Sequence, residues 1–159
     1  MENNRSVNRR SFSRFFACQI LFSYFFDSDK NKSIDDLIAS FEEYYIVSEY
    51  FNDDFEEYKK NVNLKFLQDL LKGVIKNIDS INSTIDTTLI GKYTSATIDK
   101  FIMCILRLAI YEFQNTDIDK KIIINEYVDI AGEYLDEKGV SFVNATLDKL
   151  SKVNNYEPQ

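Results

Sequence analysis

Apolar residues recur at intervals of three and four along most of this 159-residue chain. In the clearest window the polar residues Lys100, Arg107 and Gln114 lie opposite an apolar stripe on a helical projection. That stripe consists of Ile98, Phe101, Ile102, Ile105, Leu106, Ala109 and Phe113. Spacing of this kind is typical of an amphipathic helix with one face on a core. Similar stripes within 124–135 and 140–150 predict two more helices near the C-terminus.

Periodic windows of this kind predict seven helices in all. They cover residues 8–26, 34–51, 62–78, 80–90, 96–114, 119–135 and 139–150. The chain has one proline and four glycines, and it lacks Asn-Gly and Asp-Gly, the strongest hairpin signals. The predicted fold is therefore all-α, a compact bundle of about seven helices in a single domain over residues 1–159. The acidic, aromatic segment 49–63 is expected to be a partly helical insertion on the surface.

The composition argues against an enzyme. The chain has no histidine, which excludes histidine-based nucleophilic or general-base catalysis. Cys18 and Cys104 lie far apart in apolar runs, so we expect two buried thiols rather than zinc ligands. The glycines form no phosphate-binding loop, and acid pairs such as Asp35 and Asp36 lie among other charged residues. We therefore predict no catalytic residue, no metal and no cofactor.

The sequence shows no sign of a membrane segment. No apolar run reaches the roughly 20 residues that a helix needs to cross a bilayer. The N-terminal stretch lacks the small-residue cleavage site of a secretory signal. The expected location is the cytoplasm.

Charge is distributed unevenly along the chain, whose formal net charge is −7. Residues 1–26 carry four arginines and one acid, a net charge of +3. Residues 27–60 carry eleven acids and four bases, a net charge of −7. Only the N-terminal end is basic, so we expect any polyanion to bind there.

The first predicted helix combines this positive charge with an unusually apolar body. Residues 8–26 are apolar on both sides of a helical projection, which predicts burial between neighbouring helices. Arg10 and Arg14 share a face at the N-terminal end of this predicted helix, where cations oppose the helix dipole and repel each other. Such an end is well suited to hold a phosphate. Two interpretations stay open: the arginines bind RNA, or they form ion pairs with acids of segment 27–60.

Four motifs in register resemble one known family. The stretch "RSFSRFFACQILF" (10–22) resembles the opening helix of the NusB transcription antitermination family. The three C-terminal signatures of that family are similar to "ILRLAIYEF" (105–113), "INEYVDIA" (124–131) and "FVNATLDKL" (142–150). The resemblance implies two packed three-helix groups and a non-enzymatic adaptor. Such an adaptor binds the boxA element of nascent ribosomal RNA together with the ribosomal protein NusE, and helps RNA polymerase to read through terminators.

The resemblance also implies site residues. Arg9, Arg10 and Arg14 fall at the RNA-binding arginines of the family, and Ser141 and Phe142 lie near its RNA path. The positions that contact NusE correspond to Phe22, to Ile102 in place of the usual acid, and to nearby Asp99. Other departures from the family pattern are Phe12 at a usually basic position and Ala145 at a usual glycine. The chain is expected to be a monomer or a homodimer.

Alternatives exist at the level of the protein and of single residues. The chain could be a purely protein-binding helical module, or a stand-alone accessory domain of the kind that precedes ribosomal RNA methyltransferases. Glu112 is expected to be buried with a hydrogen-bond partner. Asn125 and Asn144 are expected to make hydrogen bonds at helix ends or between helices rather than to bind RNA. Phe142 could stack on a base or pack in the core.

Overall fold

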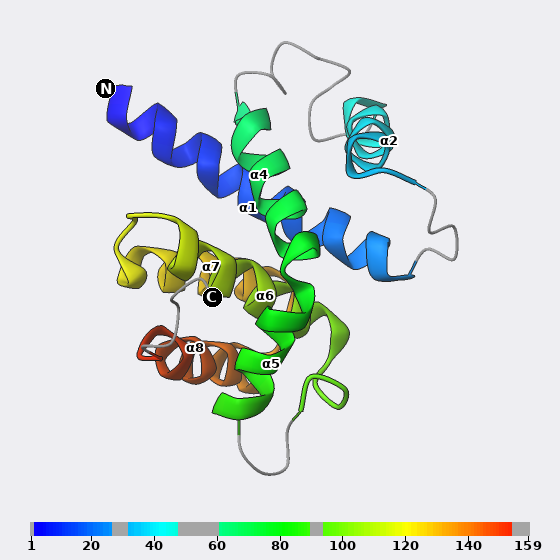
Figure 1. The fold of residues 1–159 in the computed structure, drawn as a ribbon. Coiled ribbons are helices and arrows are strands. Elements are labelled where there is room, and N and C mark those ends of the chain that lie inside the picture. Colours follow the sequence, from blue (N-terminus) through cyan, green and yellow to red (C-terminus); the bar gives the residue numbers. More distant parts are fainter. Residues whose placement is uncertain (1, 27–31, 48–60, 90–93, 154–159) are drawn as a thin grey trace. The chain divides into compact units, whose positions relative to one another are not determined.

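A computed structural model of the chain describes residues 2–26, 32–47, 61–89 and 94–153 (Figure 1). The described residues form helices and no strand, which confirms the all-α prediction. The helices are α1 (Glu2–Phe26), α2 (Ile34–Val47), α4 (Leu64–Lys76), α5 (Ile78–Thr88), α6 (Lys100–Asn115), α7 (Lys120–Tyr134) and α8 (Glu137–Ser151). None of them is long and apolar enough to span a membrane.

The chain divides into two compact units. Unit 1, Met1–Lys72, contains α1, α2 and the first part of α4. Unit 2, Gly73–Gln159, contains the end of α4 and the helices α5 to α8.

Short polar residues cap the helices and so determine where they start. The periodicity had predicted these starts two to four residues from their observed positions. Asp99 caps α6, since its carboxylate accepts hydrogen bonds from the backbone N–H groups of Phe101 and Ile102. Asp136 caps α8 by accepting from the backbone N–H of Gly139. Between α4 and α5, the Asn77 side chain donates to the carbonyl of Gly73 at 2.8 Å. The predicted windows therefore mark the buried faces, and these caps mark the ends.

The core of unit 1 is built on the middle of α1. Phe16, Ala17, Cys18, Ile20 and Leu21 are at most 1% exposed. The burial predicted for residues 8–26 between neighbouring helices is wrong at their C-terminal end. There Phe25 is 40% exposed and Phe26 is 54% exposed.

The predicted surface insertion, 49–63, is only partly visible. Residues 48–60 lie outside the described part of the chain. At the described end the prediction is wrong, because Val62 is 3% exposed and belongs to the core. Asn63 then begins α4, since its side-chain oxygen accepts the backbone N–H of Phe66 at 3.1 Å.

Unit 2 is centred on α6, which contacts α5, α7 and α8 (Figure 1). Glu112 on α6 is fully buried and accepts a 2.6 Å hydrogen bond from the hydroxyl of Tyr127 on α7. This confirms the expected buried partner. Gly73 near the end of α4 faces the ring of Tyr111 so closely that a Cβ would clash with it. A side chain larger than hydrogen cannot fit there unless Tyr111 moves.

Candidate nucleic-acid interface

The arginines lie well inside α1 and not at its start. The helix begins at Glu2, and no glycine or proline interrupts residues 2–8. Arg9 is therefore two turns from the N-terminus, and Arg14 is more than three turns from it. The dipole acts mainly within the first turn. The prediction of a phosphate site at a helix N-terminus is thus wrong for the described helix, and any anion must be held by the side chains.

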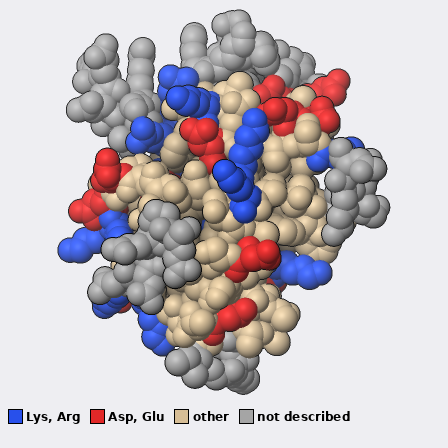
Figure 2. Space-filling model, viewed as in Figure 1, with Lys and Arg blue, Asp and Glu red and all other residues tan. Residues whose placement is uncertain are grey.

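The three arginines differ sharply in exposure. Arg9 is exposed, Arg10 is half-buried and Arg14 is only 2% exposed. In this conformation Arg9 and Arg10 offer surface to a ligand, whereas Arg14 belongs to the interior. Acidic and basic side chains are interleaved on the face drawn in Figure 2. The immediate neighbours of each arginine therefore matter more than the net charge.

Arg9 is linked to the backbone that precedes α4. Its Nη2 donates to the carbonyl oxygen of Val62 at 3.3 Å. Beside it, the fully buried hydroxyl of Ser13 accepts the backbone N–H of Asn63 at 2.9 Å and donates to the carbonyl of Arg9 at 2.7 Å. These bonds fix the start of α4 against α1.

Arg10 and Arg14 share one aromatic neighbour, Phe66 on α4. The guanidinium carbon of Arg10 lies 5.3 Å from the ring centroid, and that of Arg14 lies 5.1 Å from it. Both distances are within the range of cation–π attraction. The Nε of Arg10 is buried and makes no hydrogen bond within the described part of the chain. Sequence reasoning missed Phe66, because no local pattern connects residues more than 50 positions apart.

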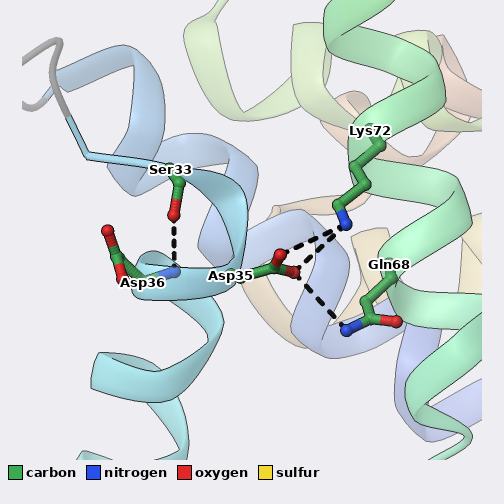
Figure 3. A network of polar contacts seen from close by, with 5 residues as sticks. All are labelled: Ser33, Asp35, Asp36, Gln68 and Lys72. Carbon is green, nitrogen blue, oxygen red and sulfur yellow. Dashed lines mark hydrogen bonds and ion pairs between the residues drawn. The ribbon is translucent and has the colours of Figure 1, made fainter.

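One acid of segment 27–60 forms an ion pair with a lysine of α4. Asp35, at the start of α2, lies 3.2 Å from Nζ of Lys72 on α4 (Figure 3). The amide of Gln68 also donates to Asp35, at 3.4 Å. In the same turn, the backbone N–H of Asp36 donates to the hydroxyl of Ser33 at 3.1 Å. Asp35 thus serves to join α2 to α4.

Ser141 and Phe142 belong to the second turn of α8, in unit 2. Ser141 is exposed and Phe142 is half-buried. Asp136 caps the helix one turn earlier, so the backbone that carries both residues is regular. Phe142 therefore has both a packed part and an accessible part.

The residues expected to contact NusE have different local roles. Phe22 on α1 is half-buried, and its ring centroid lies 4.5 Å from that of Phe26. Asp99 is exposed, and its carboxylate caps α6. Ile102 is 9% exposed and belongs to the core of unit 2. Of these, Phe22 and Asp99 offer more surface to a partner than Ile102 does.

A hollow of about 340 Å³ lies on α7 and α8. Its lining consists of Lys121, Ile124, Asn125, Asn144, Ala145 and Asp148. Asn125 and Asn144 are exposed at the rim of this hollow. The hydrogen bonds expected for their side chains stay a prediction.

Cys18 and Cys104 are buried and form no disulfide, as expected. Burial raises the pKa of the Cys104 thiol to about 12, so this sulfur is a neutral thiol at physiological pH. Among the described residues, no group of three or more histidine, cysteine or acidic side chains could hold a metal ion.

Comparison with known proteins identifies the family. The sequence profile of the NusB family matches residues 11–152. "Transcription antitermination protein NusB" of Rickettsia bellii is 32% identical over 158 residues, which cover 97% of this chain and 96% of that protein. The Bradyrhizobium protein of the same name is 29% identical over 151 residues, which cover 94% of this chain and 85% of the relative.

Solved structures agree on the fold. NusB from T. maritima superimposes with a TM-score of 0.68 at 24% identity, over 90% of each chain. A chain from the structure "Crystal Structure of a Plectonemic RNA Supercoil" gives 0.69 at 20% identity, over 91% of this chain and 94% of that one. The all-α fold, the four motifs in register and these matches over nearly the whole chain lead to one conclusion: the protein belongs to the NusB family of transcription antitermination proteins.

Proposed function

We propose that this protein is a non-enzymatic RNA-binding adaptor that binds boxA RNA together with NusE. In this role it promotes read-through by transcribing RNA polymerase in the bacterial cytoplasm. The observation that carries the proposal is the pair Arg9 and Arg10, which present accessible positive charge on α1 of an otherwise acidic protein. A chain of the same fold also forms part of a crystal structure of an RNA supercoil.

Arg9 and Arg10 are suited to contact phosphates. An arginine fork matches phosphate oxygens geometrically and keeps its charge at all physiological pH values. Two such contacts on a single strand give a log–log salt slope of about −1.4, at about −0.7 per contact. Arg14, at 2% exposure, supports this surface from the interior. Ser141 and Phe142 extend the RNA interface in this proposal, with the accessible part of the Phe142 ring stacking on a base.

The exposed aromatic end of α1 is the proposed NusE surface. Phe22 packs on Phe26, and among the described residues of unit 1 the rings of Phe25 and Phe26 are exposed. Aromatic side chains with part of the ring exposed are favoured anchors of protein interfaces. Asp99 is a further contact in this proposal, whereas Ile102 contributes at most its small exposed edge.

A titration of fluorescent boxA RNA tests the proposal, with and without NusE, against a scrambled RNA of equal length. The protein alone should bind weakly, because its net charge of −7 repels RNA at long range. NusE should tighten the binding to boxA more than to the scrambled strand. Equal affinity for both RNAs in the presence of NusE would contradict the proposal.

The burial of Arg14 and the exposure of Phe25 and Phe26 favour a second candidate function, a helical module that binds only protein. Under that function, Phe22→Ala weakens NusE binding while Arg9→Ala has no effect on any binding. The same titration separates the two candidates, since the protein-binding module gains no RNA affinity when NusE is added.

A further inference from the structure

Phe66 of α4 lies outside all four family-like motifs. Two guanidinium groups of α1 lie over its ring, at 5.3 Å for Arg10 and 5.1 Å for Arg14. Two cations one helical turn apart repel each other. The negative face of an aromatic ring attracts both and offsets that repulsion. Phe66 therefore fixes where these two charges lie.

The ring is itself held in place from α1. The Ser13 hydroxyl accepts the backbone N–H of Asn63, and the Asn63 side chain accepts the backbone N–H of Phe66. This series of contacts begins on α1, passes through the first turn of α4 and returns to α1 at Arg10. All of these residues belong to unit 1.

The ring of Phe66 is the neighbour that can orient the guanidinium of Arg10. The Nε of Arg10 is buried and makes no hydrogen bond within the described part of the chain, so a hydrogen bond at Nε does not set the direction of the guanidinium. The residue nevertheless keeps part of its surface exposed. A long side chain that is already ordered loses less conformational entropy when it binds a phosphate.

We propose that Phe66 is a positioning residue for RNA binding, whose ring holds the guanidinium of Arg10 in the orientation that contacts the RNA backbone. This inference rests on the proposed RNA-binding function. It adds a residue of α4 to a surface otherwise assigned to α1. Phe66 itself touches no RNA in this proposal.

A double-mutant cycle between positions 10 and 66 tests the proposal on the full chain. Single-stranded boxA RNA is titrated in the presence of NusE at several salt concentrations, and the melting temperature of each variant is measured. Phe66→Leu should lower RNA affinity about three- to tenfold, in line with the loss of a cation–π contact. The salt slope should hardly change, since Arg10 is still present. Phe66→Tyr, which keeps the ring face, should bind RNA like the parent.

Arg10→Ala should lower both the affinity and the salt slope, the slope by about 0.7. Phe66→Leu should then cost no further affinity in the Arg10→Ala background. Leu64→Ala, at a 44% exposed position two residues before Phe66 and on the opposite side of α4, is the control and should leave RNA affinity unchanged. If Phe66→Leu does not fold, Phe66→Met replaces it, with a flexible side chain of similar volume.

The outcomes separate this inference from the function on which it rests. A parent protein that binds boxA no better than scrambled RNA overturns the proposed function, and the positioning role with it. If the parent binds boxA, but Phe66→Leu lowers RNA affinity equally in the parent and in the Arg10→Ala background, only the positioning role is overturned. Loss of affinity in Phe66→Tyr as large as in Phe66→Leu does the same.

Discussion

The helices α1 and α6 are both rich in apolar residues, but they bury charge in different ways. On α6, Glu112 is fully buried and receives the hydroxyl of Tyr127. On α1, Arg14 is nearly as buried, with its guanidinium over the ring of Phe66. One helix pairs its buried carboxyl group with a hydroxyl in a core, and the other places a guanidinium close to the more exposed Arg9 and Arg10. An apolar composition alone therefore does not separate a core helix from one that also exposes charged side chains.

The largest expected effect concerns the polar contact on α6. Glu112→Ala should lower the free energy of unfolding by about 3 kcal/mol, because it opens a cavity and leaves the Tyr127 hydroxyl without this acceptor. Urea denaturation measures the change. Glu133→Ala, at an exposed position on α7, is the control and should stay within about 0.5 kcal/mol of the parent. An equally small effect at Glu112 would show that its hydrogen bond with Tyr127 contributes little to stability.

The next effect concerns the packing on Tyr111 of α6. Gly73→Ala should destabilise the protein by about 2 kcal/mol, because the added Cβ clashes with that ring. Gly132→Ala on α7 meets nothing within 4 Å and should instead stabilise the protein by about 0.5–1 kcal/mol. Thermal unfolding of the pair gives opposite signs if close packing at Gly73 is the cause. A gain in stability at both positions would contradict it.

The comparison is sharpest at the arginines of α1. Arg14→Ala should lower stability by about 1 kcal/mol, since its side chain packs on Phe66 in the interior. Arg9→Ala should change stability by less than about 0.5 kcal/mol and act mainly on RNA affinity. If the helix started at residue 8, Arg14 would lie close to the positive end of the dipole, and its loss would raise stability. Because α1 starts at Glu2, Arg14 lies too far from that end for this effect.

The smallest expected effect lies at the other end of α1. Phe26→Ala should leave the melting temperature close to that of the parent, because the ring is 54% exposed. The same change should weaken NusE binding about threefold if the aromatic end of α1 is an interface. Calorimetric titration with NusE measures it. A clear fall in melting temperature with unchanged NusE affinity would assign Phe26 to the core.

The sequence predicted the parts of the molecule that depend on local periodicity. The stripes of α6, α7 and α8 were identified because one face of each helix is buried, and Glu112 stood out as a charge on such a face. Its partner Tyr127 could not be named, since the choice depends on how α7 packs on α6. The buried faces of helices are thus predictable from spacing, whereas the partner of a given side chain is a tertiary property.

The candidate site was predicted less completely for a related reason. The positions of Arg9, Arg10 and Arg14 came from the family resemblance, but their contacts with Val62 and Phe66 join residues that are remote in sequence. The early start of α1 was missed because residues 2–7 carry no apolar stripe. Such a segment gives no periodic signal even when nothing interrupts the helix.

The hydrogen bond between Ser13 and Asn63 limits which amino acids can replace these two residues during evolution. It joins a side chain on α1 to a backbone N–H ahead of α4, so it restricts residue 13 and not the identity of residue 63. A buried site with room for a hydroxyl admits serine and excludes larger side chains. Residue 63 is restricted only by its own cap on Phe66, which aspartate, serine or threonine can also supply. Substitutions should therefore accumulate at position 63 and be rare at position 13, although the two residues share one contact.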